Sequence, residues 1–199
     1  MTHTKGQGKL FDNNETHSGA MHNGQELALS KELLVSWRKK IHAYQAKLFD
    51  GLQTHHEQGS LFAEVEENSF TDLQPLKLSA LPLNFWRWAK SPHEGPAIYL
   101  VMDKLEEINS YILLYIGETI SADKRWKGEH DCKAYLDAYC EALAAAGITS
   151  KLSIRFWSDV PHETKARRKV EQSLIQLWHP PFNKETRSRW STPFTTAIN

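Results

Sequence analysis

The pattern of hydrophobic and polar positions changes at Ser30. Residues 1–29 are polar and have no period, and such a segment buries too little apolar surface to offset the entropy cost of ordering. We therefore expect a mobile tail there. Beyond it, apolar residues recur at steps of three and four, at Leu34, Trp37, Ile41, Tyr44, Leu48 and Leu52. This spacing predicts an amphipathic helix from the N-cap Ser30 to near Thr54.

The apolar stripe of this helix allows two arrangements. It could form the seam of a homodimer, but a stripe this short more commonly packs against its own domain. Both a monomer and a homodimer stay open. The following residues, 58–96, show no regular period but contain the cluster Phe85-Trp86-Arg87-Trp88. These aromatics either stack on an unpaired base or, more commonly, anchor an irregular segment to a core.

A new unit begins after Gly95-Pro96. Apolar runs at 97–102 and 111–116 flank a polar stretch at 103–110, which predicts a hairpin with a long loop. A helical period follows over 131–146 and ends at Gly147. Residues 152–157 alternate as in a strand, and 161–178 predict a last helix before Pro180-Pro181.

The predicted order is thus β-β-α-β-α, a small α/β (α+β) domain. We expect a central, mainly antiparallel sheet flanked by helices, with an N-terminal helical extension. The predicted organisation is a tail at 1–29, a helix and irregular docking segment at 30–94, the compact domain at 95–190, and a C-terminal tail at 191–199.

Composition indicates the compartment. No apolar stretch approaches the roughly 18 residues of a membrane span, and the N-terminus lacks the hydrophobic core of a signal peptide. The two cysteines, Cys132 and Cys140, are about 12 Å apart along one predicted helix, too far to form a disulfide. We expect a cytoplasmic protein with no membrane partner.

The zero net charge hides a segregation along the chain. Residues 1–119 hold 11 Lys/Arg against 15 Asp/Glu, whereas residues 151–199 hold 9 against 4. The basic C-terminal quarter is suited to face phosphates, although each single charge is equally compatible with a solvated helix face.

Five polar residues supply the chemistry of a phosphodiesterase: Tyr99, Tyr115, Arg125, Glu171 and Asn183. The phenols lie in predicted strands, and they occur as Ala97-Ile98-Tyr99 and Tyr115-Ile116-Gly117. Arg125 follows Tyr115 by ten residues, and Asn183 follows Glu171 by twelve. In order and spacing, these residues resemble the GIY-YIG nuclease family over roughly residues 95–190.

Four features depart from the family pattern. The first motif has Ala97 in place of glycine, and the predicted hairpin loop is longer than usual. Glu118 follows the second motif, where many members have lysine or glutamine. His130 lies one position away from the spacing at which some relatives place a histidine.

The resemblance implies a divalent-metal-dependent endonuclease that hydrolyses a nucleic acid, with DNA the expected substrate. Glu171 would hold Mg²⁺ or Mn²⁺, Tyr99 would be the general base, and Tyr115 would orient the water or the phosphate. Arg125 would bind the scissile phosphate, and His130 is a further catalytic candidate. Gly117 and Asn183 would support the site, and the cations expected to contact nucleic acid are Lys124, Lys127, Arg167 and Arg168.

Other interpretations remain for these residues. Glu171 could form an ion pair with Arg167 or Arg168 on its own helix instead of holding a metal. The domain as a whole could be a catalytically weak or inactive nucleic-acid-binding or scaffold module, or a metal-dependent RNA or nucleotide phosphodiesterase.

Overall fold

The computed structural model describes residues 29–50, 73–127 and 131–192, without the side chain of residue 131. Residues 1–28 of the predicted tail at 1–29, residues 193–199 of the predicted tail at 191–199 and the candidate His130 lie outside these ranges. The first helix ends at Phe49, with Asp50 as its C-cap, rather than near Thr54 as predicted.

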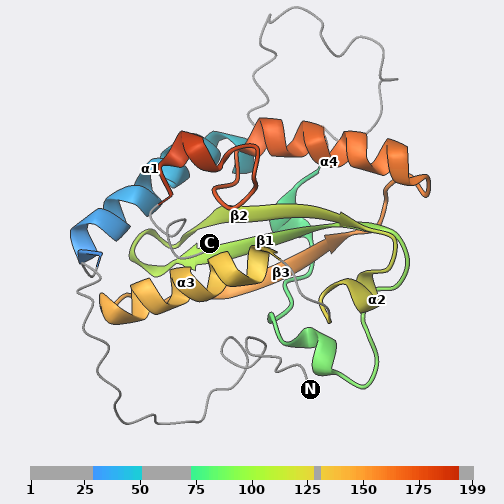
Figure 1. Cartoon of the computed structure of the whole chain (residues 1–199), viewed down its shortest axis with the longest axis horizontal. Helices are drawn as coiled ribbons and strands as arrows, with labels where there is room; N and C mark the ends of the chain where they lie inside the picture. The colour runs from blue at the N-terminus through green and yellow to red at the C-terminus, as the bar shows by residue number, and fades with distance from the viewer. Residues whose placement is uncertain (1–28, 51–72, 128–130, 193–199) are drawn as a thin grey trace, which may run out of the picture.

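Helices pack around one three-stranded sheet (Figure 1). In chain order the elements are α1 (Lys31–Phe49), β1 (Ala97–Leu105), β2 (Ser110–Thr119), α2 (Ala122–Arg125), α3 (Asp131–Ala145), β3 (Leu152–Trp157) and α4 (Thr164–Trp178). Short 3₁₀ turns lie at Pro75–Lys77, Phe85–Arg87, Glu106–Ile108 and Arg187–Trp190. The strands are antiparallel in the order β2-β1-β3, so the predicted α/β fold class is confirmed.

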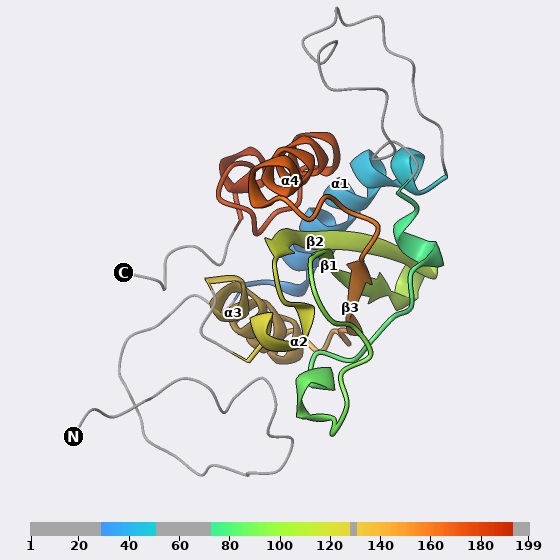
Figure 2. The ribbon, with the colours of Figure 1, turned by 90° about the vertical axis from the view of Figure 1, so that its right-hand side faces the viewer.

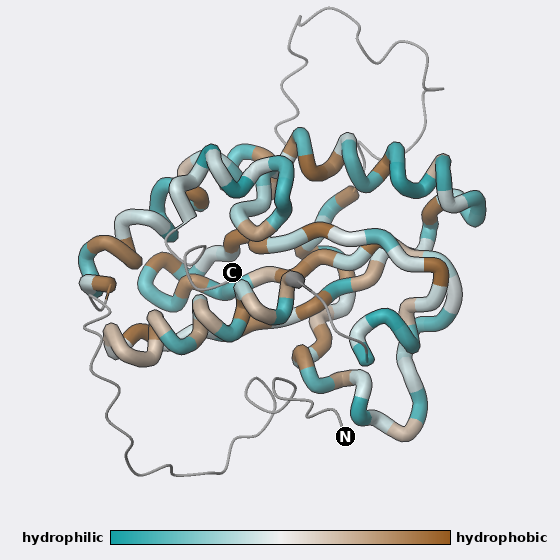
Figure 3. The backbone as a smooth tube through the Cα atoms, viewed as in Figure 1, coloured by the Kyte–Doolittle hydropathy of each residue, from teal (hydrophilic) through white to brown (hydrophobic). Residues whose placement is uncertain are grey.

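The sheet separates two apolar layers. One lies between the sheet and α3 and includes Tyr99, Leu136 and Phe156. The other lies between the sheet and α4 and includes Ile98, Leu100 and Trp178. Figure 2 shows α3 and α4 on opposite faces of the sheet, and Figure 3 shows hydrophobic residues along the strands and hydrophilic ones along much of α4.

Several predicted boundaries hold. The Leu33 N–H donates to the Ser30 hydroxyl at 3.2 Å, which confirms Ser30 as the N-cap of α1. Gly147 follows α3 with φ of 66°, a left-handed conformation that favours glycine. The predicted third strand coincides with β3. None of the helices in the described ranges is long and apolar enough to cross a membrane.

The predicted long hairpin loop is wrong. β1 continues to Leu105 and β2 begins at Ser110, so only residues 106–109 connect them. The polar residue Asp103 stays in the strand because buried partners satisfy its carboxylate: Tyr139 donates to it at 2.6 Å and Arg38 at 3.0 Å. The last helix also begins at Thr164 rather than at residue 161.

Strand register sets which side chains meet. Tyr99 pairs with Gly117 and Val101 with Tyr115, so the two tyrosines are diagonal neighbours on one face. Between Val101 and Met102 the register shifts, and Leu114 is the extra residue on β2. Such bulges are common next to active sites, where they re-aim side chains.

Candidate active site

The two tyrosines form a stacked pair on the α3 side of the sheet. Their ring centroids are 6.0 Å apart with an interplanar angle of 28°. The side chain of Tyr99 is fully buried and packs edge-to-face with Trp126, at 5.9 Å between ring centroids, whereas that of Tyr115 is half-buried. Their hydroxyls are hydrogen-bonded to each other. Solvent therefore reaches this pair from the Tyr115 side.

Gly117 makes the close approach of these rings possible. It lies opposite Tyr99 on the neighbouring strand, and a Cβ at this position would overlap the Tyr99 ring and hydroxyl. It would also approach the Tyr115 ring at 2.9 Å. The glycine is needed here for space, not for its backbone freedom.

Gly117→Ala is expected to disrupt the tyrosine pair and to destabilise the fold by about 1–3 kcal/mol, because the added methyl group overpacks a buried site. Chemical denaturation would measure the loss, and tyrosine fluorescence would report the changed environment of the rings. Ala142→Gly, on the half-buried side of α3, is the control: it shows how much the exchange of alanine and glycine changes the free energy of unfolding away from the tyrosine pair. A Gly117→Ala variant as stable as wild type would contradict this view of the packing.

Arg125 reaches the pair from the short helix α2. The buried residues Ala122 and Trp126 fix this helix, and the Ala122 N–H donates to the Gly95 carbonyl at 2.9 Å. Arg125 is an exposed residue, and its guanidinium donates a hydrogen bond to the buried Tyr99 hydroxyl. The predicted arginine thus contacts the predicted tyrosine.

These contacts form a directional chain. Arginine only donates, so the Tyr99 oxygen accepts from Arg125 and its own O–H is available to Tyr115. Burial raises the pKa of both phenols well above the usual value, and Arg125 acts in the opposite direction on both. Tyr115 is the last acceptor in this hydrogen-bonded series, so a proton taken from solvent would be accepted by the Tyr115 oxygen.

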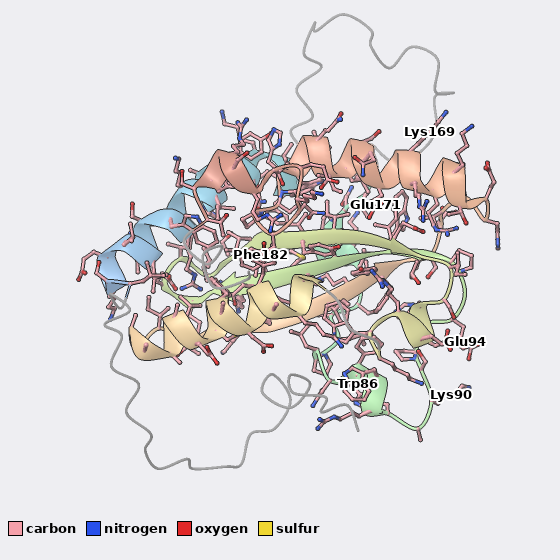
Figure 4. The ribbon with its side chains drawn as sticks, viewed as in Figure 1. Trp86, Lys90, Glu94, Lys169, Glu171 and Phe182 are labelled. Carbon is pink, nitrogen blue, oxygen red and sulfur yellow. The ribbon has the colours of Figure 1, made fainter. Side chains whose placement is uncertain are left out.

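Glu171 lies on α4, on the side of that helix turned toward β2 (Figure 4). Its Oε1 accepts the Glu118 backbone N–H of β2 at 2.9 Å. Burial raises the pKa of Glu171 to about 7; the hydrogen bond from Glu118 lowers it, and the nearby carboxylate of Glu118 raises it. The charge of Glu171 in turn raises the pKa of Tyr115. A carboxylate in this position gains from a neighbouring cation.

Both helix arginines pair with Glu118, not with Glu171. Arg167 donates to Glu118 Oε2 through Nε at 2.9 Å, and Arg168 donates to Oε1 at 3.1 Å. The Arg167 side chain is fully buried and also donates to the carbonyls of Pro161 and His162, at 3.1 and 3.0 Å. The ion pairs considered for Glu171 on its own helix therefore form with Glu118.

The cations predicted to contact nucleic acid therefore differ in exposure: one is buried and three are exposed. Arg167 is enclosed by protein, so its guanidinium is not placed where a phosphate would reach it. Arg168 is 66% exposed, and Lys124 and Lys127 are exposed on and just after α2. In the sequence Glu118 stands out only as a departure from a family pattern; the signal that it has partners is the pair of consecutive arginines, Arg167 and Arg168, on α4.

Asn183 fixes the segment after α4 to the outer edge of β2. Its side-chain amide accepts the Ile116 N–H at 2.9 Å and donates to the Ile116 carbonyl at 2.8 Å. The Phe182 N–H donates to the carbonyl of the bulged Leu114 at 3.0 Å. Gln45 of α1, which the sequence did not single out, pairs in the same way with Leu113, at 2.8 and 3.0 Å.

The outer edge of β2 thus explains the spacing of Glu171 and Asn183. Gln45, Asn183 and Glu171 each satisfy backbone groups that an edge strand would otherwise present to solvent or to another chain. The segment from Glu171 to Asn183 is therefore fixed along the edge of β2, which sets its position relative to the tyrosines.

Few of the described side chains near Glu171 could serve as metal ligands. Within the described ranges, no group of three or more His, Cys, Asp or Glu side chains could hold a metal ion. A single carboxylate fits a Mg²⁺ ion that keeps several waters and takes its other ligands from a substrate phosphate. Glu171 fits that description.

Comparison of the chain with family models, with curated proteins and with solved structures gave no match.

Glu171→Gln is expected to change how stability depends on pH. In the folded protein the carboxyl keeps its proton up to about pH 7, whereas the unfolded chain releases it near its ordinary pKa of about 4.3. Because the folded state binds more protons in this window, the stability of the metal-free protein falls as pH rises from about 4.3 to 7.

Relative to wild type, the Gln variant should therefore gain about 1–2 kcal/mol between pH 5 and pH 8, a value reduced for the partial exposure of the group. Urea denaturation in EDTA at both pH values measures this gain. Glu163→Gln, on an exposed residue just before α4, is the matched control. Parallel pH profiles of wild type and Glu171→Gln would show that Glu171 keeps an ordinary pKa.

Proposed function

We propose that the protein is a divalent-metal-dependent endonuclease of the GIY-YIG type that hydrolyses phosphodiester bonds of a nucleic acid, with DNA as the substrate. The observation that carries this proposal is the hydrogen-bonded chain from Arg125 through Tyr99 to Tyr115, with the Glu171 carboxylate beside its end. A permanent cation, a proton acceptor and a metal-binding carboxylate are the groups that such hydrolysis requires.

The geometry modifies the roles implied by the resemblance. Tyr99 is fully buried and Tyr115 is half-buried, so we place Tyr115 next to the attacking water and Tyr99 behind it. Donation from Tyr99 lowers the pKa of Tyr115 and so favours its acting as the base. Arg125 polarises Tyr99 and, being exposed, also offers its remaining N–H groups to a phosphate.

A Mg²⁺ or Mn²⁺ ion held by Glu171 would stabilise charge on the phosphate oxygens. The Glu118–Arg167 ion pair and the Glu118 N–H hold Glu171 in place by fixing α4 to β2. Asn183 holds the other end of the same segment.

Tyr115→Phe is expected to lower the cleavage rate more than Tyr99→Phe does, because Tyr115 is partly exposed to solvent whereas Tyr99 is fully buried. General base catalysis contributes about 10²–10⁴-fold, which sets the scale for Tyr115→Phe. Single-turnover cleavage of one labelled substrate by both variants measures the difference. A larger loss of cleavage rate for Tyr99→Phe would assign the role of general base to Tyr99, as the family resemblance implies.

A second candidate function is a nucleic-acid-binding or scaffold module without efficient cleavage. It is favoured by the raised pKa values of both phenols and by Glu118, which neutralises two arginines. Such a module would bind nucleic acid in a salt-dependent manner but would not cut it with any divalent ion.

The deciding experiment is cleavage of plasmid, branched DNA and RNA by the full chain in Mg²⁺, Mn²⁺ or EDTA. The proposal expects nicked or linear DNA with either metal and none in EDTA. Salt-dependent binding without products in any metal would support the second candidate, and cleavage of RNA alone would move the substrate class to RNA. The solution mass, measured alongside the ratio of nicked to linear plasmid, shows whether double-strand cutting uses a homodimer.

A further inference from the structure

A second concave site lies beside α2. The described residues enclose a cavity of about 240 Å³ there. Its lining includes Trp86, Trp88, Lys90, Glu94, Asp123 and Lys127. Figure 4 shows Trp86, Lys90 and Glu94 below α2, away from Glu171 on α4. This cavity is separate from the tyrosine pair, but it shares the helix that carries Arg125.

The aromatic residues of this segment have different tasks. Phe85 is buried, and its ring packs edge-to-face with that of Phe156, at 5.3 Å between ring centroids. The 3₁₀ turn Phe85–Arg87 then fixes Trp88, whose N–H donates to the Phe85 carbonyl at 3.0 Å. Trp88 is nevertheless 48% exposed. Phe85 and the partly buried Trp86 pack on the core and anchor the turn, so the indole of Trp88 is left to contact a ligand.

The charges of the cavity favour a nucleobase over a bare phosphate. Lys90 and Lys127 are balanced by Glu94 and Asp123, so the site has no excess of positive charge to hold an anion. Carboxylates accept hydrogen bonds from exocyclic amino groups of bases, and indoles stack on base faces. The lining therefore offers one group for the face of a base and others for its edge.

The position of the cavity connects it with the reaction site. Lys127 lies in the cavity wall, two residues after Arg125, and Trp126 between them contacts Tyr99. A nucleotide whose phosphate reached Arg125 would have a neighbouring base within reach of the cavity.

We propose that this cavity binds one unpaired nucleobase adjacent to the scissile phosphate, stacked on Trp88, with preference for bases that carry an amino group. The proposal rests on the proposed function and names its substrate class: nucleic acid with an unpaired nucleotide at the cut, such as a bulge, flap or branch. A fully paired duplex cannot supply such a base without unstacking it.

The test is a two-by-two comparison in EDTA, where binding is measured without cleavage. Fluorescence anisotropy gives the Kd of the full chain for a labelled duplex with a single unpaired cytosine, and for the same duplex with an abasic site at that position. Stacking contributes about 1–3 kcal/mol per base, so the abasic change should weaken wild-type binding by about 10-fold. Trp88→Ala should lose the same factor, and the abasic change should then cost it nothing more.

Leu76→Ala is the matched control, because Leu76 is also an exposed apolar residue, at 45%, but lies in a different 3₁₀ turn. This variant should keep the full discrimination of wild type. A thymine in the unpaired position should bind more weakly than cytosine if Glu94 or Asp123 reads an amino group.

Two results would overturn the inference. One is an unchanged ratio between the cytosine and abasic ligands in Trp88→Ala, which would make Trp88 a site for another partner or a bystander. The other is equal binding of both ligands by wild type. Failure of the proposed function would look different, because the Trp88-dependent discrimination would persist in a chain that cuts no substrate in Mg²⁺ or Mn²⁺.

Discussion

Arg125→Ala is expected to lower the rate of metal-dependent DNA cleavage by about 10²–10³-fold while leaving the fold intact. The loss has two physical causes. The guanidinium stabilises charge that develops on the phosphate, and removal of one such donor typically costs a factor of this size. It also donates to Tyr99, and without it the pKa of both phenols rises further above the usual value. The base would then be harder to ionise at neutral pH.

Arg125→Lys separates these two causes. A lysine keeps the charge but loses the planar fork that can contact a hydroxyl and a phosphate together. We expect an intermediate rate and a pH profile closer to wild type than that of Arg125→Ala. Single-turnover cleavage across pH 6–9 measures both quantities, and circular dichroism checks the fold.

Lys40→Ala, on an exposed residue of α1, is the control for the loss of a surface cation. It should cleave at the wild-type rate. Cleavage by Arg125→Ala within a few-fold of this control would exclude Arg125 from the catalytic groups and favour a role as a surface charge beside Lys124.

The elements that the sequence predicted well are those whose pattern repeats locally. The apolar stripe of α1, the alternation of β3 and the helical period of α3 each gave the right element, because one face of each packs on the core. The hairpin loop was mispredicted because Asp103 is polar, and its burial depends on Arg38 and Tyr139, which are distant in sequence.

In the candidate site, too, some features follow from the local sequence and others depend on tertiary packing. The order of Tyr99, Tyr115, Arg125 and Glu171 can be read from the sequence, but their meeting depends on the register of β1 and β2 and on the bulge at Leu114. A shift of one residue would turn Tyr115 to the other face. The difference in burial between the tyrosines, which moves the water-facing position to Tyr115, arises only from tertiary packing.

The buried charges around Asp103 carry the largest expected effect on stability. Arg38 and Asp103 are both fully buried and pair at 3.0 Å. Asp103 also accepts the Tyr139 hydroxyl at 2.6 Å and the Lys151 N–H at 2.7 Å, so it joins α1, β1, α3 and the segment before β3. Burial raises the pKa of Asp103 in spite of these donors. The pair is therefore costly to bury, and Arg38 also donates to the partly exposed Glu107 at 3.0 Å.

Asp103→Ala is expected to lower the free energy of unfolding by about 3–5 kcal/mol, the loss typical of breaking a buried ion pair. Arg38 keeps its ion pair with the partly exposed Glu107, but the Tyr139 hydroxyl and the Lys151 N–H lose their acceptor. Urea denaturation measures this loss. Glu106→Ala, which removes an exposed ion pair with Lys151 in the same region, should leave the free energy of unfolding close to that of wild type.

The double variant Arg38→Met, Asp103→Leu distinguishes a buried-charge penalty from simple loss of packing. Apolar residues of similar size often replace a buried ion pair with little loss, so the double variant should recover most of the stability lost in Asp103→Ala. If instead the double variant is as unstable as the single one, the hydrogen bonds from Tyr139 and Lys151 to Asp103, and not its pairing with Arg38, hold these four segments together.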